Sequence, residues 1–461
     1  MAEPVAGNHP APDSSLPETS VPGPPEPDVA VRGDRLVRNA ASLVATTGTT
    51  AVLGLLFWTL AARHYPDAEV GRATTTIAAA TVLGGLSGDY LSAIMIRFLA
   101  TAGQRTRVVV ARAYAIGAIT GLVVATLFVL AGLGSVYIPD TTTQKLFFIG
   151  MVVLFVVFAL QDAVLTGLGR APAVLVENIL FSAAKVVLVL LGVSLLAVNS
   201  IILAWVIPAF LAVIGVTAYL VLVVMRGGSE ALSGGSTFPQ RGAVVSYASA
   251  EYVRRLLSSA VSFVLPLLVA HQLGLEQAAY FSVPWLILGV VSIMLSNVSS
   301  ALVVESERSE QHTTVLLRKA ILLGVGASLL ATVLLLLFAP FALGILGDSY
   351  AEHSTGLVRL FALSLPFSAP VALYGTLLWL DRKLWHLTLV QGGASFLTIV
   401  GSVLLLGPLG LNGIGVAYLV AEIVVALVCS PFLVRRLRQL SAEGPDSSMS
   451  INPRSLTWGD S

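Results

Sequence analysis

The amino-acid sequence predicts an all-α polytopic membrane protein with about twelve transmembrane helices, arranged as two six-helix bundles related by a parallel pseudo-twofold repeat. The first observation is composition, because the 461 residues are 56% hydrophobic and only 11% charged, whereas soluble proteins average about 25% charged residues. The second is a series of long apolar runs. The third is a correspondence between the two halves of the chain. Together they exclude a soluble globular domain.

The apolar runs are separated by glycine, proline or charged residues. A helix rises ~1.5 Å per residue, so ~20 apolar residues cross the ~30 Å hydrocarbon core of a bilayer. Each run therefore predicts one transmembrane helix. In the second run, Gly84 and Gly88 form a GxxxG pattern that favours close helix packing. The runs cover residues 39–62, 73–96, 108–136, 146–168, 173–197, 200–225, 244–273, 279–304, 315–338, 357–380, 385–406 and 411–434.

Lysine and arginine are distributed unequally between the predicted loops. With a cytoplasmic amino terminus, eighteen of the 26 lie in cytoplasmic loops and flanks. Four are inside spans or distal, namely Lys185, Arg254, Arg255 and Arg454. The outer loops hold only Arg63, Arg72, Lys145 and Arg359. Because cytoplasmic loops of membrane proteins carry the excess of these residues, we expect a multi-pass protein of the cell membrane with both termini in the cytoplasm.

The two halves of the chain overlay when the sequence is shifted by 208 residues, which brings the seventh and eighth spans onto the first two. In this register Thr46, Thr47 and Thr50 of the first span match Arg254, Arg255 and Ser258 of the seventh. Each half has six spans, so both begin on the same side of the membrane, as parallel repeats do. The predicted organisation is a disordered cytoplasmic tail at 1–35, a first bundle at 36–226, a cytoplasmic linker at 227–243, a second bundle at 244–438 and a cytoplasmic tail at 439–461.

The seventh span, Val244 to Leu273, carries three charged residues well inside its ends. Charges inside a span are costly and usually face a cavity or a partner, so this polar face is the leading candidate site. The alternative is an internal pair between Glu251 and Arg255, four residues apart, that only supports packing. At 100° per residue, one arc of about 100° collects Tyr247, Glu251, Arg254, Arg255, Ser258 and Ser262.

Asp89 in the second span lies at the same predicted depth as Arg254. It is ~12 Å along the helix from the cytoplasmic Arg97, and Arg254 is ~15 Å from the start of its own span. The two side chains are therefore candidates for a pair that closes the cytoplasmic side. Asp89 is also a candidate for binding a proton or Na⁺, and a purely structural polar contact is the alternative.

Two further charged residues lie deep in predicted spans. Lys185 is close to the midplane of the fifth span, where its ammonium cannot reach either surface, and Asp162 and Glu177 are its candidate partners. A structural pair inside the first bundle is the alternative interpretation. Glu422 is similarly deep, about twelve residues from the end of the twelfth span.

Three short segments resemble a known family. Residues 57–71 read FWTLAARHYPDAEVG, residues 88–97 read GDYLSAIMIR and residues 409–417 read LGLNGIGVA. They are similar to the polysaccharide flippase family, which handles lipid-linked oligosaccharides, of the multidrug/oligosaccharidyl-lipid/polysaccharide exporter superfamily. That superfamily also contains the MATE multidrug exporters and the lipid II flippase. The resemblance covers roughly 36–438, and Asp89 departs from it. It implies a coupling-ion role for an acid of the second bundle, here Glu422.

The resemblance and the cations of the seventh span together predict a transporter that flips a lipid-linked oligosaccharide or polysaccharide precursor across the cytoplasmic membrane by alternating access. The expected substrate is a polyprenyl diphosphate-linked glycan, whose phosphate oxygens guanidinium groups contact bidentately. The expected substrate-binding residues are Arg254, Arg255, Ser258, Thr46 and Thr50. The candidates for ion coupling or gating are Asp89, Glu251, Lys185 and Glu422.

Two other functions compete with this prediction. A MATE-like, cation-coupled multidrug exporter would require an acidic site, and Asp89, Glu251 and Glu422 favour it. A membrane glycosyltransferase or ligase would require a large outer loop or domain, and the predicted outer loops are short, so no enzyme activity is expected. No cofactor or metal is predicted beyond a coupling proton or Na⁺. The expected partners are membrane lipids and cell-envelope polysaccharide assembly proteins, with no nucleic acid.

Overall fold

The computed structural model describes residues 49–195, 199–224, 241–308, 313–380 and 384–442. Within these ranges the chain forms helices joined by short turns, and no strand is present. Each of the twelve predicted spans corresponds to one helix. The predicted tails at 1–35 and 439–461 and the linker at 227–243 fall largely outside the described residues, so the predicted domain boundaries remain a prediction.

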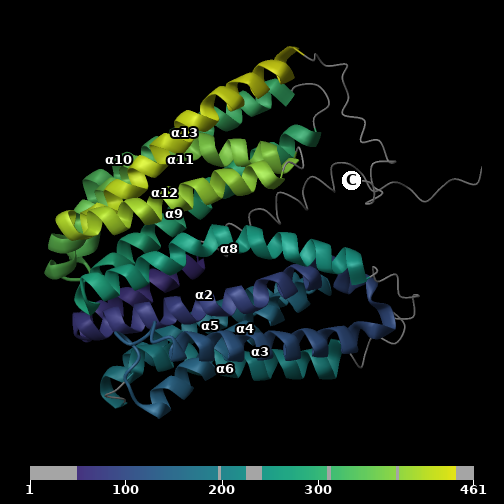
Figure 1. The fold of residues 1–461 in the computed structure, drawn as a ribbon, viewed down its shortest axis with the longest axis vertical. Helices are drawn as coiled ribbons and strands as arrows, with labels where there is room; N and C mark the ends of the chain where they lie inside the picture. The colour runs from purple at the N-terminus through teal and green to yellow at the C-terminus, as the bar shows by residue number, and fades with distance from the viewer. Residues whose placement is uncertain (1–48, 196–198, 225–240, 309–312, 381–383, 443–461) are drawn as a thin grey trace, which may run out of the picture. The chain divides into compact units, whose positions relative to one another are not determined.

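The first bundle begins with a helix described over residues 49–64, which a two-residue break separates from α2. Helices α2 to α6 lie together in Figure 1. A short π-helical segment, Leu220–Val224, continues α6. The helices are α2 (Asp67–Phe98), α3 (Thr106–Leu130), α4 (Thr142–Gly167), α5 (Ala171–Leu195) and α6 (Ser200–Tyr219).

The helices of the second bundle mostly extend beyond the predicted apolar runs, by up to nine residues at the start of α11. Polar residues can continue a helix because its hydrogen bonds are formed by the backbone and not by the side chains. The helices are α8 (Arg241–Gln272), α9 (Leu275–Arg308), α10 (Thr313–Gly344), α11 (Asp348–Leu380), α12 (Leu384–Leu409) and α13 (Leu411–Ala442).

Ten helices in the described part of the chain are long and apolar enough to cross a membrane. Among the described residues of α8, a shorter apolar stretch covers Ser259–Gln272. The charged residues that the sequence singled out precede this stretch in α8. The chain is therefore a multi-pass membrane protein.

Helix neighbours recur between the two bundles. In the first, α4 packs against α2, α3, α5 and α6. In the second, α11 packs against α9, α10, α12 and α13. The pairs α2–α3 and α5–α6 likewise match α9–α10 and α12–α13. Each of these helix pairs in the first bundle recurs in the second between the helices whose numbers are seven higher. This recurrence confirms the predicted two-bundle fold with an internal repeat.

Small residues allow close approach inside the first bundle, as the GxxxG pattern predicted. A methyl group on Gly88 would lie 3.2 Å from Val156 of α4, and one on Gly84 would lie 3.5 Å from Phe155. Both glycines are buried. Helices α2 and α4 therefore approach each other closely at Gly84 and Gly88, because these glycines place no side chain between the two helices.

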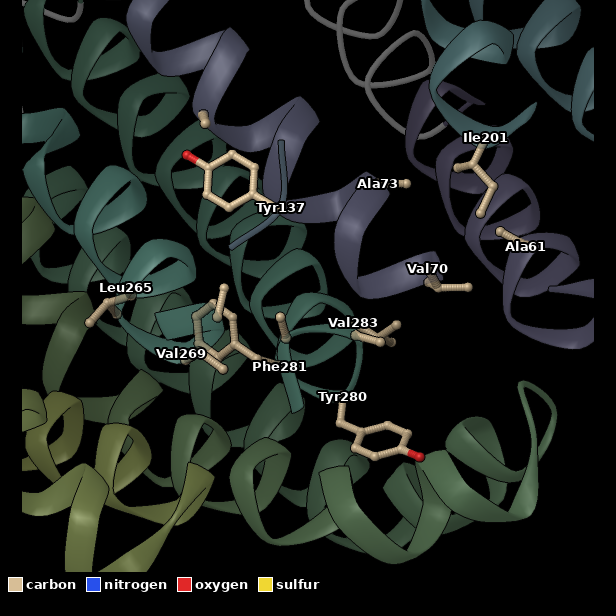
Figure 2. Close-up of a cluster of buried hydrophobic side chains, with 14 of the residues drawn as sticks. Ala61, Val70, Ala73, Tyr137, Ile201, Leu265, Val269, Tyr280, Phe281 and Val283 are labelled. Carbon is tan, nitrogen blue, oxygen red and sulfur yellow. The ribbon is translucent and has the colours of Figure 1, made fainter. Parts of the chain in front are cut away.

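Helix α2 also packs against α8 and α9 of the second bundle. We call the contacts near the turn at Pro66 the Pro66 joint; it consists of Arg63, Asp67, Gly71, Tyr280 and Ile345. The Tyr280 hydroxyl donates to Asp67 Oδ2 at 2.6 Å, and Arg63 Nε donates to the Ile345 carbonyl at 2.6 Å. Figure 2 shows Tyr280 in the same apolar cluster as Val70 and Val283. The joint thus combines hydrogen bonds with a buried apolar core.

Candidate functional site

The predicted polar face lies on a continuous helix. Glu251, Arg254, Arg255 and Ser258 all fall within α8, so the periodicity that placed them on one face holds for the backbone. The placement of their side chains remains a prediction. Thr46 lies outside the described residues. Thr50 is half-buried in the first helix.

The middle of α8 is packed between elements of both bundles. The Tyr252 ring meets Tyr90 of α2 edge to face, with 5.9 Å between ring centroids. The Ser395 hydroxyl of α12 donates to the Leu257 carbonyl of α8 at 3.2 Å. Because Asp89 precedes Tyr90 directly, the half-buried Asp89 and residue 252 of α8 lie at one level of the structure. The equal depth of the Asp89 and Arg254 side chains remains a prediction.

A pocket of about 380 Å³ lies inside the second bundle, and Glu422 is one of its lining residues. We call it the Glu422 pocket. The Tyr418 and Ser368 hydroxyls are the hydrogen-bonding neighbours of the Glu422 carboxyl. Trp285 and Tyr418 meet edge to face at 6.3 Å and supply aromatic walls. The polar lining residues also include Ser262, Ser292, Gln391, Ser395 and Thr398.

The chemistry of the Glu422 pocket favours a cation. It offers one carboxylate together with hydroxyl and amide oxygens, the ligand types that hard cations prefer. Its aromatic rings present negative π faces that attract organic cations as well. The pocket thus brings together Glu422 of α13 and Ser262 of α8.

Lys185 occupies an aromatic cage in the first bundle. Its side chain is only 7% exposed. The Nζ atom lies 3.9 Å from the ring centroid of Trp205, 4.3 Å from that of Phe181 and 6.0 Å from that of Phe57. These rings come from three different helices, so the ammonium is held by π faces at a point where the first helix, α5 and α6 converge.

The carboxylate partners expected for Lys185 are elsewhere, so that part of the prediction was wrong. Asp162 accepts a hydrogen bond from Asn178 at 3.2 Å and faces Glu177. Neither carboxyl pairs with Lys185 among the described residues. Glu177 and Lys185 are eight residues apart on α5, or ~12 Å along the helix axis. Side chains on one helix meet at separations of three or four residues, not eight.

Several functional candidates were missed from the sequence. Gln391, Ser395 and Thr398 line one face of α12 at spacings of four and three residues, a helical pattern that the sequence contained. The aromatic cage offered no such signal, because Phe57, Phe181 and Trp205 are far apart in the chain. In the described part of the chain, no group of three His, Cys, Asp or Glu residues is arranged to hold a metal ion.

Comparison with known proteins identifies the fold. No family model matches the sequence, and no curated protein matches it. A multidrug resistance MATE family transporter of the MOP superfamily, in an inward-facing conformation, superposes with a TM-score of 0.63 at 15% identity, over 87% of this chain and 96% of that one. The lipid II flippase MurJ, in an inward closed conformation, gives a TM-score of 0.63 at 11% identity, over 86% of this chain and 87% of that one.

A third solved structure is a MOP superfamily transporter from Pyrococcus furiosus, described as having a binding pocket of reverse polarity that suggests a different function. Its TM-score is 0.54 at 15% identity, over 88% of this chain and 96% of that one. MATE exporters and a lipid II flippase are thus matched over nearly the whole chain. The protein has the two-bundle fold of the MOP superfamily transporters.

Proposed function

We propose that this protein is a transporter that flips a lipid-linked oligosaccharide or polysaccharide precursor across the cytoplasmic membrane by alternating access. The observation that carries the proposal is the adjacent cation pair Arg254 and Arg255 within α8, a helix that packs against α2 of the first bundle and α9 and α12 of the second. A diphosphate must be stabilised by cations when it leaves water, and guanidinium groups match its oxygens in pairs. We propose Ser258, Thr46 and Thr50 as further substrate contacts.

A MATE-like export of organic cations is the second candidate, and the Glu422 pocket favours it. A carboxylate beside Trp285 and Tyr418 suits a cation better than a diphosphate. In the flippase proposal, the same carboxyl binds a coupling proton or Na⁺, and Asp89 and Glu251 contribute to coupling or gating. The two candidates therefore differ in which bundle element contacts the substrate, α8 or the Glu422 pocket.

A reconstituted transport assay separates the two functions. Vesicles containing the protein are loaded either with a fluorescent polyprenyl diphosphate oligosaccharide or with a cationic dye. We expect movement of the lipid-linked glycan. Arg254→Lys or Arg255→Lys should remain partly active, alanine variants should be poor and glutamate variants inactive, because each lost charge-assisted contact of ~1.5–3 kcal/mol weakens binding roughly ten- to a hundredfold.

Arg359→Glu is the matched control, since Arg359 is an exposed arginine of α11. It should transport at the parental rate. Glutamate variants at 254 and 255 that still move the glycan would refute the proposal, and movement of the dye alone would establish the exporter. Repeating the assay with a proton or Na⁺ gradient tests coupling: Glu422→Gln and Asp89→Asn should alter the gradient dependence if these acids bind the coupling ion.

We also propose that both termini are cytoplasmic, on the basis of the unequal distribution of Lys and Arg. After replacement of the buried Cys429, single cysteines are placed at the exposed positions Pro66, Thr141 and Arg105. An impermeant maleimide added to intact cells should label the cysteines at 66 and 141 and spare the one at 105. The reverse pattern would show that the orientation is inverted.

A further inference from the structure

A second group of buried polar side chains lies inside the first bundle, apart from Lys185 and its aromatic cage. It consists of Tyr114 of α3, Gln161 and Asp162 of α4, and Glu177 and Asn178 of α5. Gln161 is fully buried and Glu177 is 7% exposed. Three helices therefore bring two carboxyls, two amides and a phenol together near the last turns of α4 and the first turns of α5.

Several buried polar atoms of this group lack a hydrogen-bond partner, and most of them are acceptors. Asn178 Nδ2 donates to Asp162 Oδ2 at 3.2 Å, while Asp162 Oδ1 and both carboxyl oxygens of Glu177 have no hydrogen-bond partner. Gln161 Nε2 donates to the Val213 carbonyl at 2.9 Å and to Thr217 Oγ1 at 2.8 Å. Its Oε1 atom and the Tyr114 hydroxyl are also unpartnered. Four acceptor atoms thus face one hydroxyl donor.

The described side chains around the two carboxyls include no cation that could donate the missing hydrogen bonds. The titratable groups that face Glu177 are Asp162 from α4 and Tyr114 from α3. Helix α6 contributes the Val213 carbonyl and the Thr217 hydroxyl, both of which accept hydrogen bonds from Gln161 Nε2. In the described part of the chain no lysine or arginine pairs with either carboxyl. Two facing carboxylates without a cation in a buried site would repel each other strongly.

We propose that Asp162 and Glu177 form a proton-binding site that holds one proton between the two carboxyls. The proton resides on Glu177, whose O–H donates to the unpartnered Oδ1 of Asp162. Of the two carboxyls, Asp162 is more stable as the anion, because the Asn178 amide already donates a hydrogen bond to it. The Tyr114 hydroxyl then donates to Gln161 Oε1 or to the remaining Glu177 oxygen. A single added proton removes the repulsion and satisfies two of the orphaned acceptors.

Loss of this proton would place two anions between α4 and α5. These helices otherwise meet through few contacts, whereas each packs against α6. Proton release is therefore expected to loosen α5 from α4 at this end of the bundle. The site is distinct from the Glu422 pocket and does not depend on which substrate is transported.

Infrared spectroscopy of the full-length protein in lipid tests the proposal directly. A protonated carboxyl has a C=O stretching band at a higher frequency than the bands of a carboxylate or an amide. At neutral pH, Glu177→Gln and Asp162→Asn should each lose the band of one carboxylic acid. The double variant should lose the same single equivalent, because the pair holds one proton. Asp140→Asn is the control, since Asp140 is an exposed carboxyl paired with Lys145, and it should change nothing in this band.

Three results would overturn the proposal. An unchanged band in both single variants would show that neither carboxyl is protonated. A loss of two equivalents in the double variant would show two independent acids. A band that disappears on addition of Na⁺, and not of K⁺, would show that the pair is a sodium site. Thermal unfolding of each variant, measured in parallel, ensures that spectra are compared only between folded proteins, and Asp162→Asn serves if Glu177→Gln fails to fold.

Discussion

Replacing Gly71 with alanine is expected to disrupt the Pro66 joint and to lower the stability of the protein by roughly 3 kcal/mol, as for severe overpacking. An added methyl group would lie 1.7 Å from the Leu275 carbonyl oxygen and 3.1 Å from the Ala279 nitrogen of α9. Both atoms belong to the backbone and cannot rotate away. Helices α2 and α9 must separate, which breaks the 2.6 Å hydrogen bond from Tyr280 to Asp67.

The matched control is Gly326→Ala in α10, where an added methyl group meets nothing within 4 Å. It should be neutral or should stabilise its helix by up to about 1 kcal/mol, the difference in helix propensity. The measurements are thermal unfolding and maleimide labelling of Val70→Cys, a position that is 1% exposed, in protein lacking Cys429. Gly71→Ala should expose this cysteine, and equal labelling in both backgrounds would contradict the prediction.

Replacing Lys185 with methionine is expected to raise thermal stability and to reduce transport. Burying an ammonium costs several kcal/mol, while the cation–π contacts with Trp205 and Phe181 return about 2 kcal/mol when desolvated. Methionine fills a similar volume and carries no charge, so a gain of roughly 1 kcal/mol or more follows. Lys185→Glu should instead be strongly destabilising, because a carboxylate would lie against the negative faces of the same rings.

Lys145 provides the control for this substitution. Its side chain is 41% exposed and pairs with Asp140 at the start of α4, where it holds the pKa of the Asp140 carboxyl below its ordinary value. Lys145→Met and Lys145→Glu should change unfolding little, because a solvated pair contributes little to stability. The readouts are the unfolding temperature and the rate of substrate movement in vesicles. A Lys185→Met protein that is less stable and transports normally would show that Lys185 serves packing alone.

The fold was largely predictable because a bilayer imposes strong constraints on sequence. A span must be apolar for ~20 residues and must form all its backbone hydrogen bonds within itself, so hydropathy marks twelve helices without further information. The even number of spans in each half then required a parallel repeat, which the recurring neighbours of α4 and α11 bear out. Helix ends were predicted less well, since polar residues continue α9 and α11 beyond their apolar runs.

For the candidate site, the sequence predicted less than it did for the fold. Local spacing placed Glu251, Arg254, Arg255 and Ser258 on one helix, because the period of a helix is fixed by its backbone. Partners across helices depend on rotation and register, which spacing alone does not determine. Lys185 therefore met Trp205 and Phe181 rather than Asp162 or Glu177. By itself the sequence determined which residues are charged inside the membrane, and packing decided which of them face a pocket, an aromatic ring or another acid.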